Sequence, residues 1–298
     1  MKKYFFFAAV ALMAASCIND ENDNSVADQQ NGEVISLTAS MASETTRAKA
    51  ADKLQDTQFE SDKSIHVDIY EKDATAPYTS GNYTTGTSGA MTGTLYYPAS
   101  QKHIDIEAYY PSSITYESTS FTVGTAQTSE ANYQSYDLMY ATRLTDQEKK
   151  TSGTHDLTFN HALAKIIVNI VAGSGVSDAN ITSNVTAVKI NNTITTATIA
   201  KGVVTPPTTG TKSDINIFGT GASNIGVIIP QEVAAGTFIT VTYNGNDYTY
   251  ALPSAKTFAA GNSYTYTLTL NAASISLKSE KINPWTNDAS AGSKDITL

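Results

Sequence analysis

Short segments in which apolar and polar residues alternate recur along most of the chain. In residues 34–39, for example, Ile35, Leu37 and Ala39 fall on one face of an extended backbone. A period of two of this kind is typical of a β-strand with one buried face. The clearest segments with this alternation are residues 34–39, 65–69, 104–108 and 264–270.

The second half of the chain repeats the pattern more regularly. An apolar stretch at residues 157–171 is interrupted at 161–165, and its β-branched residues predict two strands or one bent strand. The dipeptide Asn244-Gly245 favours positive φ angles and predicts a tight hairpin between two strands. The other segments predicted to be strands are residues 185–190, 194–199, 215–218, 225–229, 238–243, 248–252 and 274–277.

So many strands, with few clusters of helix-forming residues, predict an all-β protein of sandwich architecture. Valine, isoleucine, threonine and tyrosine are abundant, as expected of strands. The charged residues 146–150 interrupt the pattern near the middle of the chain. We therefore expect two β-sandwich domains in tandem, an N-terminal one at residues 48–153 and a C-terminal one at residues 154–298.

The first residues of the chain have the features of a secretory signal. Two lysines precede an apolar run at residues 4–15, which is too short to span a bilayer, and small residues lead up to Cys17. A cysteine at this place resembles the lipidation site of a bacterial lipoprotein, where acyl chains hold the protein to a membrane. We expect a lipoprotein signal peptide at residues 1–16 and a lipid on Cys17. An ordinary secretory signal with a chance cysteine is the alternative.

Residues 18–24 are polar and rich in acidic side chains. Such a segment buries little apolar surface, so it predicts a flexible tether. The same acidic run resembles the surface-export signals of bacterial lipoproteins. This resemblance implies a protein that is lipid-anchored in the outer membrane and exposed at the cell surface.

The composition argues against several kinds of function. Cys17 is the only cysteine, which excludes disulfides and thiolate metal sites, and the four histidines are scattered singly. The net charge of −9, with no basic stripe, argues against a nucleic-acid partner. No nucleophile elbow, phosphate loop or zinc-protease motif occurs. Asp105 and Glu107 are interpreted as the solvated face of a strand. We therefore expect no enzymatic activity, no metal and no cofactor.

Arginine and tyrosine are the informative residues. The chain has only two arginines, Arg47 and Arg143, so an arginine-specific protease would meet two sites. The first follows the strand predicted at residues 34–39. Tyrosine occurs 17 times against a single tryptophan, and residues 78–97 are rich in it. Exposed tyrosines could form a surface for sugars or proteins, although tyrosine is also an ordinary strand residue.

In their order along the chain, several short motifs resemble the fimbrillins, the subunits of type V pili, and in particular the Mfa-like group. None of these motifs is catalytic, and the resemblance covers most of the chain. The motifs are Ala14-Ala15-Ser16-Cys17, Thr45-Thr46-Arg47-Ala48, Tyr109-Tyr110-Pro111, the stretch from Leu157 to Ile166, Ile229-Pro230-Gln231, the stretch from Phe258 to Leu270, and Ile282-Asn283-Pro284-Trp285.

The resemblance implies two transthyretin-like β-sandwich domains behind a lipoprotein signal. It also implies that residues 17–47 are a propeptide, because an arginine-specific protease cuts such precursors, here between Arg47 and Ala48. The cut would remove the first strand, with Val34, Ile35 and Leu37. A sheet that loses a strand exposes unpaired backbone groups beside an apolar slot, which a strand from another molecule can fill.

The filling strand would come from the C-terminal stretch of a neighbouring subunit, near residues 274–298. Ile275, Leu277, Ile282 and Trp285 would supply its inward side chains. Repeated head to tail, this contact builds a filament because it does not close on itself. The implied partners are other pilus subunits, the protease, the outer membrane, and a host protein or glycan. Stalk, tip and anchor positions all stay open.

A different class of function fits part of the same pattern. A surface lipoprotein that binds glycans and never polymerises would share the signal, the tether and the β-sandwiches. Such a protein has no need of a cut at Arg47, and a face lined with tryptophan would be expected, whereas this chain has only Trp285.

Overall fold

Strands make up most of the structure. The computed structural model describes residues 32–42, 59–100, 102–285 and 294–296. The expectations for the signal peptide, for Cys17, and for Arg47 and Ala48 lie outside these residues. Within them, the α-helices are two short ones, α1 (Glu130–Gln134) and α2 (Asp178–Asn184). The prediction of an all-β fold is confirmed.

The first half of the chain contributes most of a sheet that closes on itself. Seven strands pair in the cyclic order β2-β3-β4-β1-β9-β7-β5, because β5 pairs with β2, and β8 is added beside β5. Their bounds are β1 (Leu37–Met41), β2 (Ser64–Glu71), β3 (Thr79–Thr85), β4 (Ala90–Thr92), β5 (Ile104–Tyr110), β7 (Met139–Ala141), β8 (Leu144–Gln147) and β9 (His155–His161).

The second half is built around two facing sheets. A six-stranded sheet has the order β15-β16-β10-β21-β22-β23, and a four-stranded sheet has the order β14-β11-β18-β19. The bounds are β10 (Ala164–Ala172), β11 (Val185–Ile194), β14 (Lys212–Asn216), β15 (Phe218–Thr220), β16 (Ser223–Ile228), β18 (Gly236–Tyr243), β19 (Asn246–Leu252), β21 (Asn262–Asn271), β22 (Ser274–Pro284) and β23 (Lys294–Ile296).

Smaller pieces complete the fold. A three-stranded sheet contains β6 (Ser118–Thr122), β12 (Thr196–Ala200) and β13 (Val203–Thr205). β17 (Gln231–Val233) pairs with β20 (Lys256–Phe258), and a 3-10 turn, η2 (Thr87–Gly89), precedes β4.

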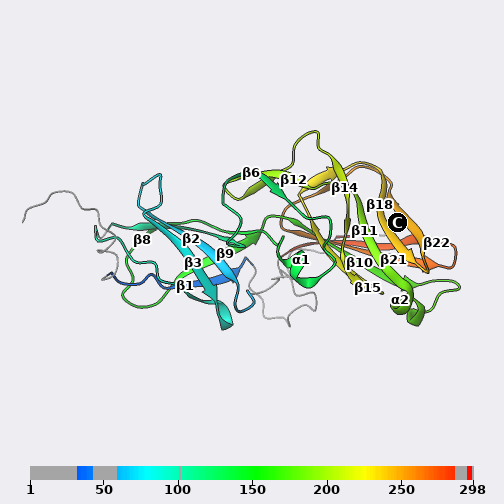
Figure 1. Ribbon diagram of the computed structural model, residues 1–298, viewed down its shortest axis with the longest axis horizontal. Helices are drawn as coiled ribbons and strands as arrows, with labels where there is room; N and C mark the ends of the chain where they lie inside the picture. The colour runs from blue at the N-terminus through cyan, green and yellow to red at the C-terminus, as the bar shows by residue number, and fades with distance from the viewer. Residues whose placement is uncertain (1–31, 43–58, 101, 286–293, 297–298) are drawn as a thin grey trace, which may run out of the picture.

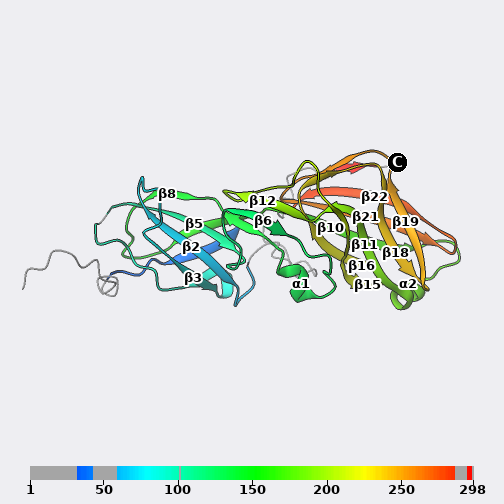
Figure 2. The same ribbon diagram turned by 45° about the horizontal axis from the view of Figure 1, so that its top comes forward.

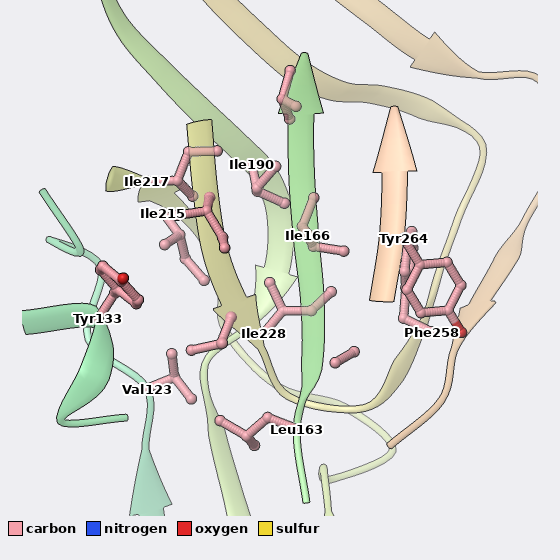
Figure 3. Close-up of a cluster of buried hydrophobic side chains, with 14 of the residues drawn as sticks. Val123, Tyr133, Leu163, Ile166, Ile190, Ile215, Ile217, Ile228, Phe258 and Tyr264 are labelled. Carbon is pink, nitrogen blue, oxygen red and sulfur yellow. The ribbon is translucent and has the colours of Figure 1, made fainter. Parts of the chain in front are cut away.

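The apolar side chains gather in two separate clusters, one inside the closed sheet and one between the two facing sheets. Figure 1 and Figure 2 show the corresponding elongated shape, with the closed sheet at one end and the facing sheets at the other. Figure 3 shows Ile166 of β10, Ile190 of β11 and Tyr264 of β21 meeting in the second cluster. We call the junction between the two parts, where β9 passes into β10 at residues 161–164, the waist.

The chain contributes to the two clusters out of sequence order. β9 lies after the expected division at residues 153 and 154, but it pairs with β1 and β7 in the closed sheet. Conversely, Phe121 and Tyr133 precede that division and pack in the second cluster. The reason is that strand pairing, rather than the charged segment at 146–150, decides where β9 lies.

Several local predictions are confirmed. Residues 157–171 form two strands, β9 and β10. The hairpin between β18 and β19 turns at Asn244 and Gly245, whose φ angles are 51° and 76°. Two helices were not predicted, and α2 begins where the hydroxyl of Ser177 accepts a hydrogen bond from the backbone nitrogen of Asn180 at 3.2 Å.

Candidate functional site

β1 is an interior strand of the closed sheet, although it comes first among the described strands. It pairs with β9 in parallel, from Leu37 opposite His155 to Met41 opposite Phe159, and with β4 in antiparallel fashion. Without β1, one edge of β9 and one edge of β4 would lose their backbone partners. We call the surroundings of residues 35–41 the β1 seat.

The inward face of β1 is fully apolar. Ile35, Leu37, Ala39 and Met41 are at most 5% exposed. The alternation predicted for residues 34–39 is therefore present, but the regular strand runs from Leu37 to Met41. Val34 is 41% exposed and only forms an isolated bridge to Tyr96. Of the three residues expected in a removable strand, Ile35 and Leu37 lie in the seat and Val34 lies outside it.

A buried tyrosine holds the start of the β1 seat. The hydroxyl of Tyr83 donates a hydrogen bond to the carbonyl oxygen of Ile35 at 2.7 Å, and the Ile35 nitrogen donates to the Leu95 oxygen at 2.8 Å. Burial raises the pKa of Tyr83 to about 12, so its hydroxyl keeps the proton that it donates. The bond from Tyr83 goes to a backbone atom, so it does not depend on the side chain at position 35.

A glycine lets η2 approach β1 closely. Gly89 has a φ angle of 79°, and a Cβ atom added there would overlap the carbonyl oxygen of Ala39. Only a residue without a side chain fits both the left-handed backbone and the short distance. The β1 seat therefore depends on Gly89 for its shape beside residue 39.

Polar contacts tie the outer face of β1 to β9. Thr38 donates a hydrogen bond to the carboxylate of Asp156, and the Ser40 hydroxyl donates to the Leu157 oxygen at 3.2 Å. The bond from Thr38, followed by one from Thr154, lowers the pKa of Asp156. An anionic carboxylate thus faces the polar side of the β1 seat.

A buried histidine begins β9 at the same seat. His155 lies 2.7 Å from the Tyr97 hydroxyl through Nε2 and 3.3 Å from the Gln147 Oε1 through Nδ1, and its backbone nitrogen donates to the Ser36 oxygen at 2.9 Å. Burial is the main cause of the lowered pKa of His155, and nearby Lys150 adds to it. The contacts fit a neutral ring that accepts at Nε2 and donates at Nδ1.

The residues expected in a donor strand lie in β22, at the other end of the molecule. β22 pairs with β21 from Ser274 opposite Asn271 to Pro284 opposite Asn262. Ile275, Leu277 and Ile282 are partly buried against the second cluster, and Trp285 is 2% exposed. In this structure the expected donor residues are therefore held within their own chain.

Buried polar groups surround Trp285 at the waist. Its ring stacks on His161, whose Nδ1 lies 2.7 Å from an oxygen of Asp137. The Lys165 ammonium lies 5.4 Å from the Trp285 ring centre. The cluster ties the end of β22 to the end of β9 and the start of β10.

The interpretation of Asp105 and Glu107 as a solvated face is wrong. Both residues are buried, at 8% and 6% exposure, because Arg143 reaches over them. One guanidinium nitrogen lies 2.9 Å from Asp105 Oδ2 and the other 2.5 Å from Glu107 Oε1, while Tyr70 donates to Glu107 at 3.0 Å. The guanidinium carbon also lies 4.6 Å from the Tyr70 ring centre. An ion-pair network between β5 and Arg143, which directly precedes β8, replaces the expected solvated face.

The tyrosine-rich residues 78–97 do not form an aromatic surface. Tyr83 and Tyr97 are buried at 1% and 5% exposure and serve the β1 seat, whereas Tyr78 is 36% exposed. Tyrosines instead border a cavity of about 350 Å³ at the waist. We call this the waist pocket; its lining includes Tyr116, Tyr140, Arg143, Asn160, Lys201 and Val203.

Sequence reasoning missed Tyr83, Gly89 and His155. Each acts on β1 across a long stretch of chain, and nothing local marks it. Among the described residues, no group of three or more metal-binding side chains comes together. No helix in the same part of the chain is long and apolar enough to cross a membrane.

The comparisons with known proteins agree on one family. The model of the fimbrillin-like family matches residues 46–285. The protein named Putative fimbrium subunit Fim1C, from Bacteroides uniformis, is 28% identical over 249 residues, which cover 78% of this chain and 80% of that protein.

Solved structures share the fold. The crystal structure of a putative cell adhesion protein from Bacteroides uniformis has a TM-score of 0.66 and 26% identity, and the match covers 85% of this chain and 99% of that one. A putative cell adhesion protein from Bacteroides ovatus has a TM-score of 0.65 at 16% identity, with 90% and 99% covered. The tip fimbrial protein Mfa3 from Porphyromonas gingivalis, truncated at its C-terminus, has a TM-score of 0.50 at 12% identity, with 85% and 100% covered. Because the family model matches more than half of the sequence, the chain belongs to the fimbrillin-like family.

Proposed function

We propose that this protein is a structural subunit of a fimbrium and that it assembles by strand exchange at the β1 seat. The observation that carries the proposal is the position of β1. It precedes Arg47 in the sequence, yet it is an interior strand that closes the first sheet. One cut after Arg47 would therefore separate from the chain a strand that the sheet needs.

The loss of β1 would leave a slot of defined chemistry. Ile35, Leu37, Ala39 and Met41 fill it with apolar side chains. Burying a side chain the size of Leu37 stabilises a fold by about 2 kcal/mol, so an empty slot attracts another apolar strand. The freed backbone of β9 adds hydrogen-bond partners for that strand. A strand from a second subunit would supply both the apolar side chains and the backbone hydrogen-bond partners.

The two arginines differ in their suitability for cleavage. Arg143 is held by Asp105 and Glu107 and lies against the ring of Tyr70. A protease needs its substrate residue extended and free, so cleavage at Arg143 would first have to break this network. Arg47 lies one residue inside the start of the family match, so the segment that contains β1 precedes the matched part. Both observations support Arg47 as the processed site and Ala48 as the new first residue.

The same proposal includes the export, anchoring and processing of the precursor. The signal at residues 1–16 directs export, a lipid on Cys17 holds the precursor in the outer membrane, and an arginine-specific protease releases residues 17–47. The two parts of the molecule are two transthyretin-like domains, and the subunit contributes to adhesion at the cell surface. Other subunits of the fimbrium are its partners, through the β1 seat.

The experiment that tests the proposal treats the purified full chain with a protease that cleaves after arginine. We expect N-terminal sequencing to find Ala48, and unboiled gels to show a ladder of polymers that boiling removes. Arg47→Ala should remain a monomer, whereas Arg143→Lys, which keeps a cation between Asp105 and Glu107, should polymerise like the natural chain. A lipidated Cys17 and one monomer band from cells, with no ladder after cleavage, would contradict the proposal.

A second candidate function is the binding of a glycan in the waist pocket. The observation that favours it is a cavity of about 350 Å³ bordered by Tyr116, Tyr140, Arg143 and Asn160. Aromatic rings beside hydrogen-bond donors suit a sugar, and the volume lies in the usual range of ligand sites. A glycan array probed with the natural chain and with Tyr116→Ala tests this function. Binding that Tyr116→Ala does not weaken would place the ligand elsewhere.

A further inference from the structure

The waist pocket combines residues from both halves of the chain. Tyr116, Tyr140 and Arg143 come from the first half, and the turn between β12 and β13 contributes Lys201 and Val203. Figure 2 shows β6 and β12 at the junction between the closed sheet and the facing sheets. One wall of the pocket is therefore set by the place of this turn.

The turn between β12 and β13 is fixed against the two tyrosines. The Gly202 nitrogen donates a hydrogen bond to the Tyr116 oxygen at 3.4 Å. A Cβ atom added to Gly202 would lie 2.9 Å from Cγ of Tyr140, so the backbone of the turn packs directly on that ring. Lys201, the residue before Gly202, is thereby held at the edge of the pocket, where its exposed side chain belongs to the lining.

Lys201 has a backbone conformation that does not suit lysine. Its φ angle is 46° and that of Gly202 is 80°, as a two-residue hairpin turn of this kind requires. Among the described residues, seven other than glycine have a positive φ, and six of them are aspartate, asparagine or serine. The matching turn between β18 and β19 has Asn244 before Gly245. A lysine where the turn favours asparagine points to a function for its side chain.

The charged side chains of the pocket lining are basic. Arg143 and Lys201 line it, and among the described residues no carboxylate does, although the whole chain has a net charge of −9. The charge of Arg143 is already balanced, because its guanidinium contacts Asp105 and Glu107. Lys201 forms no ion pair within the described part of the chain, in contrast to several other lysines. Its ammonium is therefore the charge that a ligand can use.

From this arrangement we propose that the waist pocket takes an anionic sugar, a pyranose ring that carries a carboxylate or a sulfate, with the Lys201 ammonium as its counter-ion. The inference rests on the second candidate function, glycan binding in the waist pocket, and specifies the class of glycan. Tyr116 provides an aromatic surface for the sugar ring, and Lys201 selects the charge.

The two tyrosines fit such a ligand. The half-buried Tyr116 packs edge-on against Tyr140, with ring centres 5.2 Å apart and an angle of 73° between the planes. The Tyr140 hydroxyl donates to the Thr115 oxygen at 3.3 Å, which holds that ring in place. Burial is the main cause of the raised pKa of Tyr116, so its hydroxyl stays neutral and can donate to a sugar oxygen. A volume of about 350 Å³ leaves room for a sugar residue beside these rings.

Ligand-observed NMR on the purified full chain tests the inference. The probes share one ring and differ in charge: methyl β-D-glucuronide has a carboxylate, methyl β-D-glucoside 6-sulfate has a sulfate, and methyl β-D-glucoside is neutral. We expect a charged sugar to bind roughly fivefold more tightly than the neutral one, as for an ion pair at an exposed edge. The preference should shrink as the salt concentration rises, because salt screens such a pair.

Lys201→Asn removes the ammonium without endangering the turn, because asparagine tolerates a positive φ better than lysine does. This variant should bind the neutral sugar as the natural chain does and should lose the preference for a charged one. Lys201→Arg keeps a cation and should keep the preference. The matched control is Lys212→Asn, which removes the same charge from an exposed position of β14 outside the lining and should change neither affinity.

The outcomes separate this inference from the proposed functions. Tighter binding of either charged sugar, lost in Lys201→Asn, supports it, and the tighter of the two identifies the anion. Equal affinities for charged and neutral sugars would overturn it and leave glycan binding as a candidate function. A preference that persists in Lys201→Asn would also overturn it. If none of the three sugars binds, the inference fails together with glycan binding, and strand exchange at the β1 seat is untouched.

Discussion

The indole ring of Trp285 lies flat against the imidazole ring of His161, with ring centres 3.7 Å apart and an angle of 2° between the planes. The contact joins the residue after β22 to the last residue of β9. It connects the second cluster to the closed sheet through two buried side chains. The end of β22 is thus held at the junction between the two halves of the molecule.

Truncation of Trp285 should therefore be costly. We expect Trp285→Ala to lower the free energy of unfolding by about 3–5 kcal/mol, because a large buried aromatic side chain is removed and a cavity is left. Trp285→Phe keeps a ring against His161 and should cost less than half as much. Urea unfolding followed by far-ultraviolet circular dichroism measures both values. Equal costs for the two variants would contradict a role for the stack.

Gly89 should be intolerant of a side chain. Gly89→Ala forces an alanine to a φ angle of 79° and drives its Cβ into the oxygen of Ala39. Gly153 is a matched control. Its φ angle is 83°, and a Cβ atom added there would meet no other atom within 4 Å. We expect Gly153→Ala to cost about 1 kcal/mol from backbone strain alone, and Gly89→Ala to cost about 3 kcal/mol. Similar losses of stability would show that no close approach exists.

Acid should weaken the β1 seat through His155. Its pKa lies below the usual 6.5 in the folded chain, mainly because of burial. Between the folded and the unfolded pKa, the unfolded chain binds more protons, so stability rises with pH there. The contribution of His155 to the free energy of unfolding should be constant above about pH 7 and should fall as the pH drops through 6.5.

His155→Gln provides the control for this pH dependence. Glutamine offers both an acceptor and a donor but does not titrate, so the fall in stability just below pH 6.5 should flatten. Denaturant titrations across this pH range, for the natural chain and the variant, make the comparison. A fall that persists unchanged in His155→Gln would assign it to other groups.

The network around Arg143 gives a fourth prediction. Arg143→Ala leaves the carboxylates of Asp105 and Glu107 close together and nearly buried, without their cation. We expect a loss of about 3 kcal/mol, at the low end for a buried ion pair because the arginine side chain is 34% exposed. Adding Asp105→Asn and Glu107→Gln removes the charges and should recover part of the loss. A triple variant less stable than Arg143→Ala would contradict this account.

Local patterns in the sequence predicted most of the strands. Some features depend only on residues that are close together in the sequence, so they can be predicted without the structure. Examples are the alternation in residues 65–69 and 264–270 and the turn at Asn244-Gly245. The resemblance of short motifs identified the family, which the family match confirms.

The contacts that define the site were not predictable in this way. Asp105 and Glu107 have the spacing of a solvated face, and only Arg143, 38 and 36 residues later, makes them buried. In the same way, nothing near Tyr83 in the sequence indicates that its hydroxyl bonds to Ile35, which lies 48 residues earlier. The alternation of apolar and polar residues indicates which face of a strand is buried. It does not indicate which distant residue packs against that face.

The pairing of β1 with β9 also sets the order in which the molecule folds. Thr38 and Asp156, which meet across this pair, are 118 residues apart. The first sheet therefore cannot close until more than half of the chain has been synthesised, and contacts of such long range form slowly. The first of the described strands to be synthesised is therefore a strand whose place in the sheet is completed late, and until then the apolar face of β9 that it covers stays open to unwanted contacts.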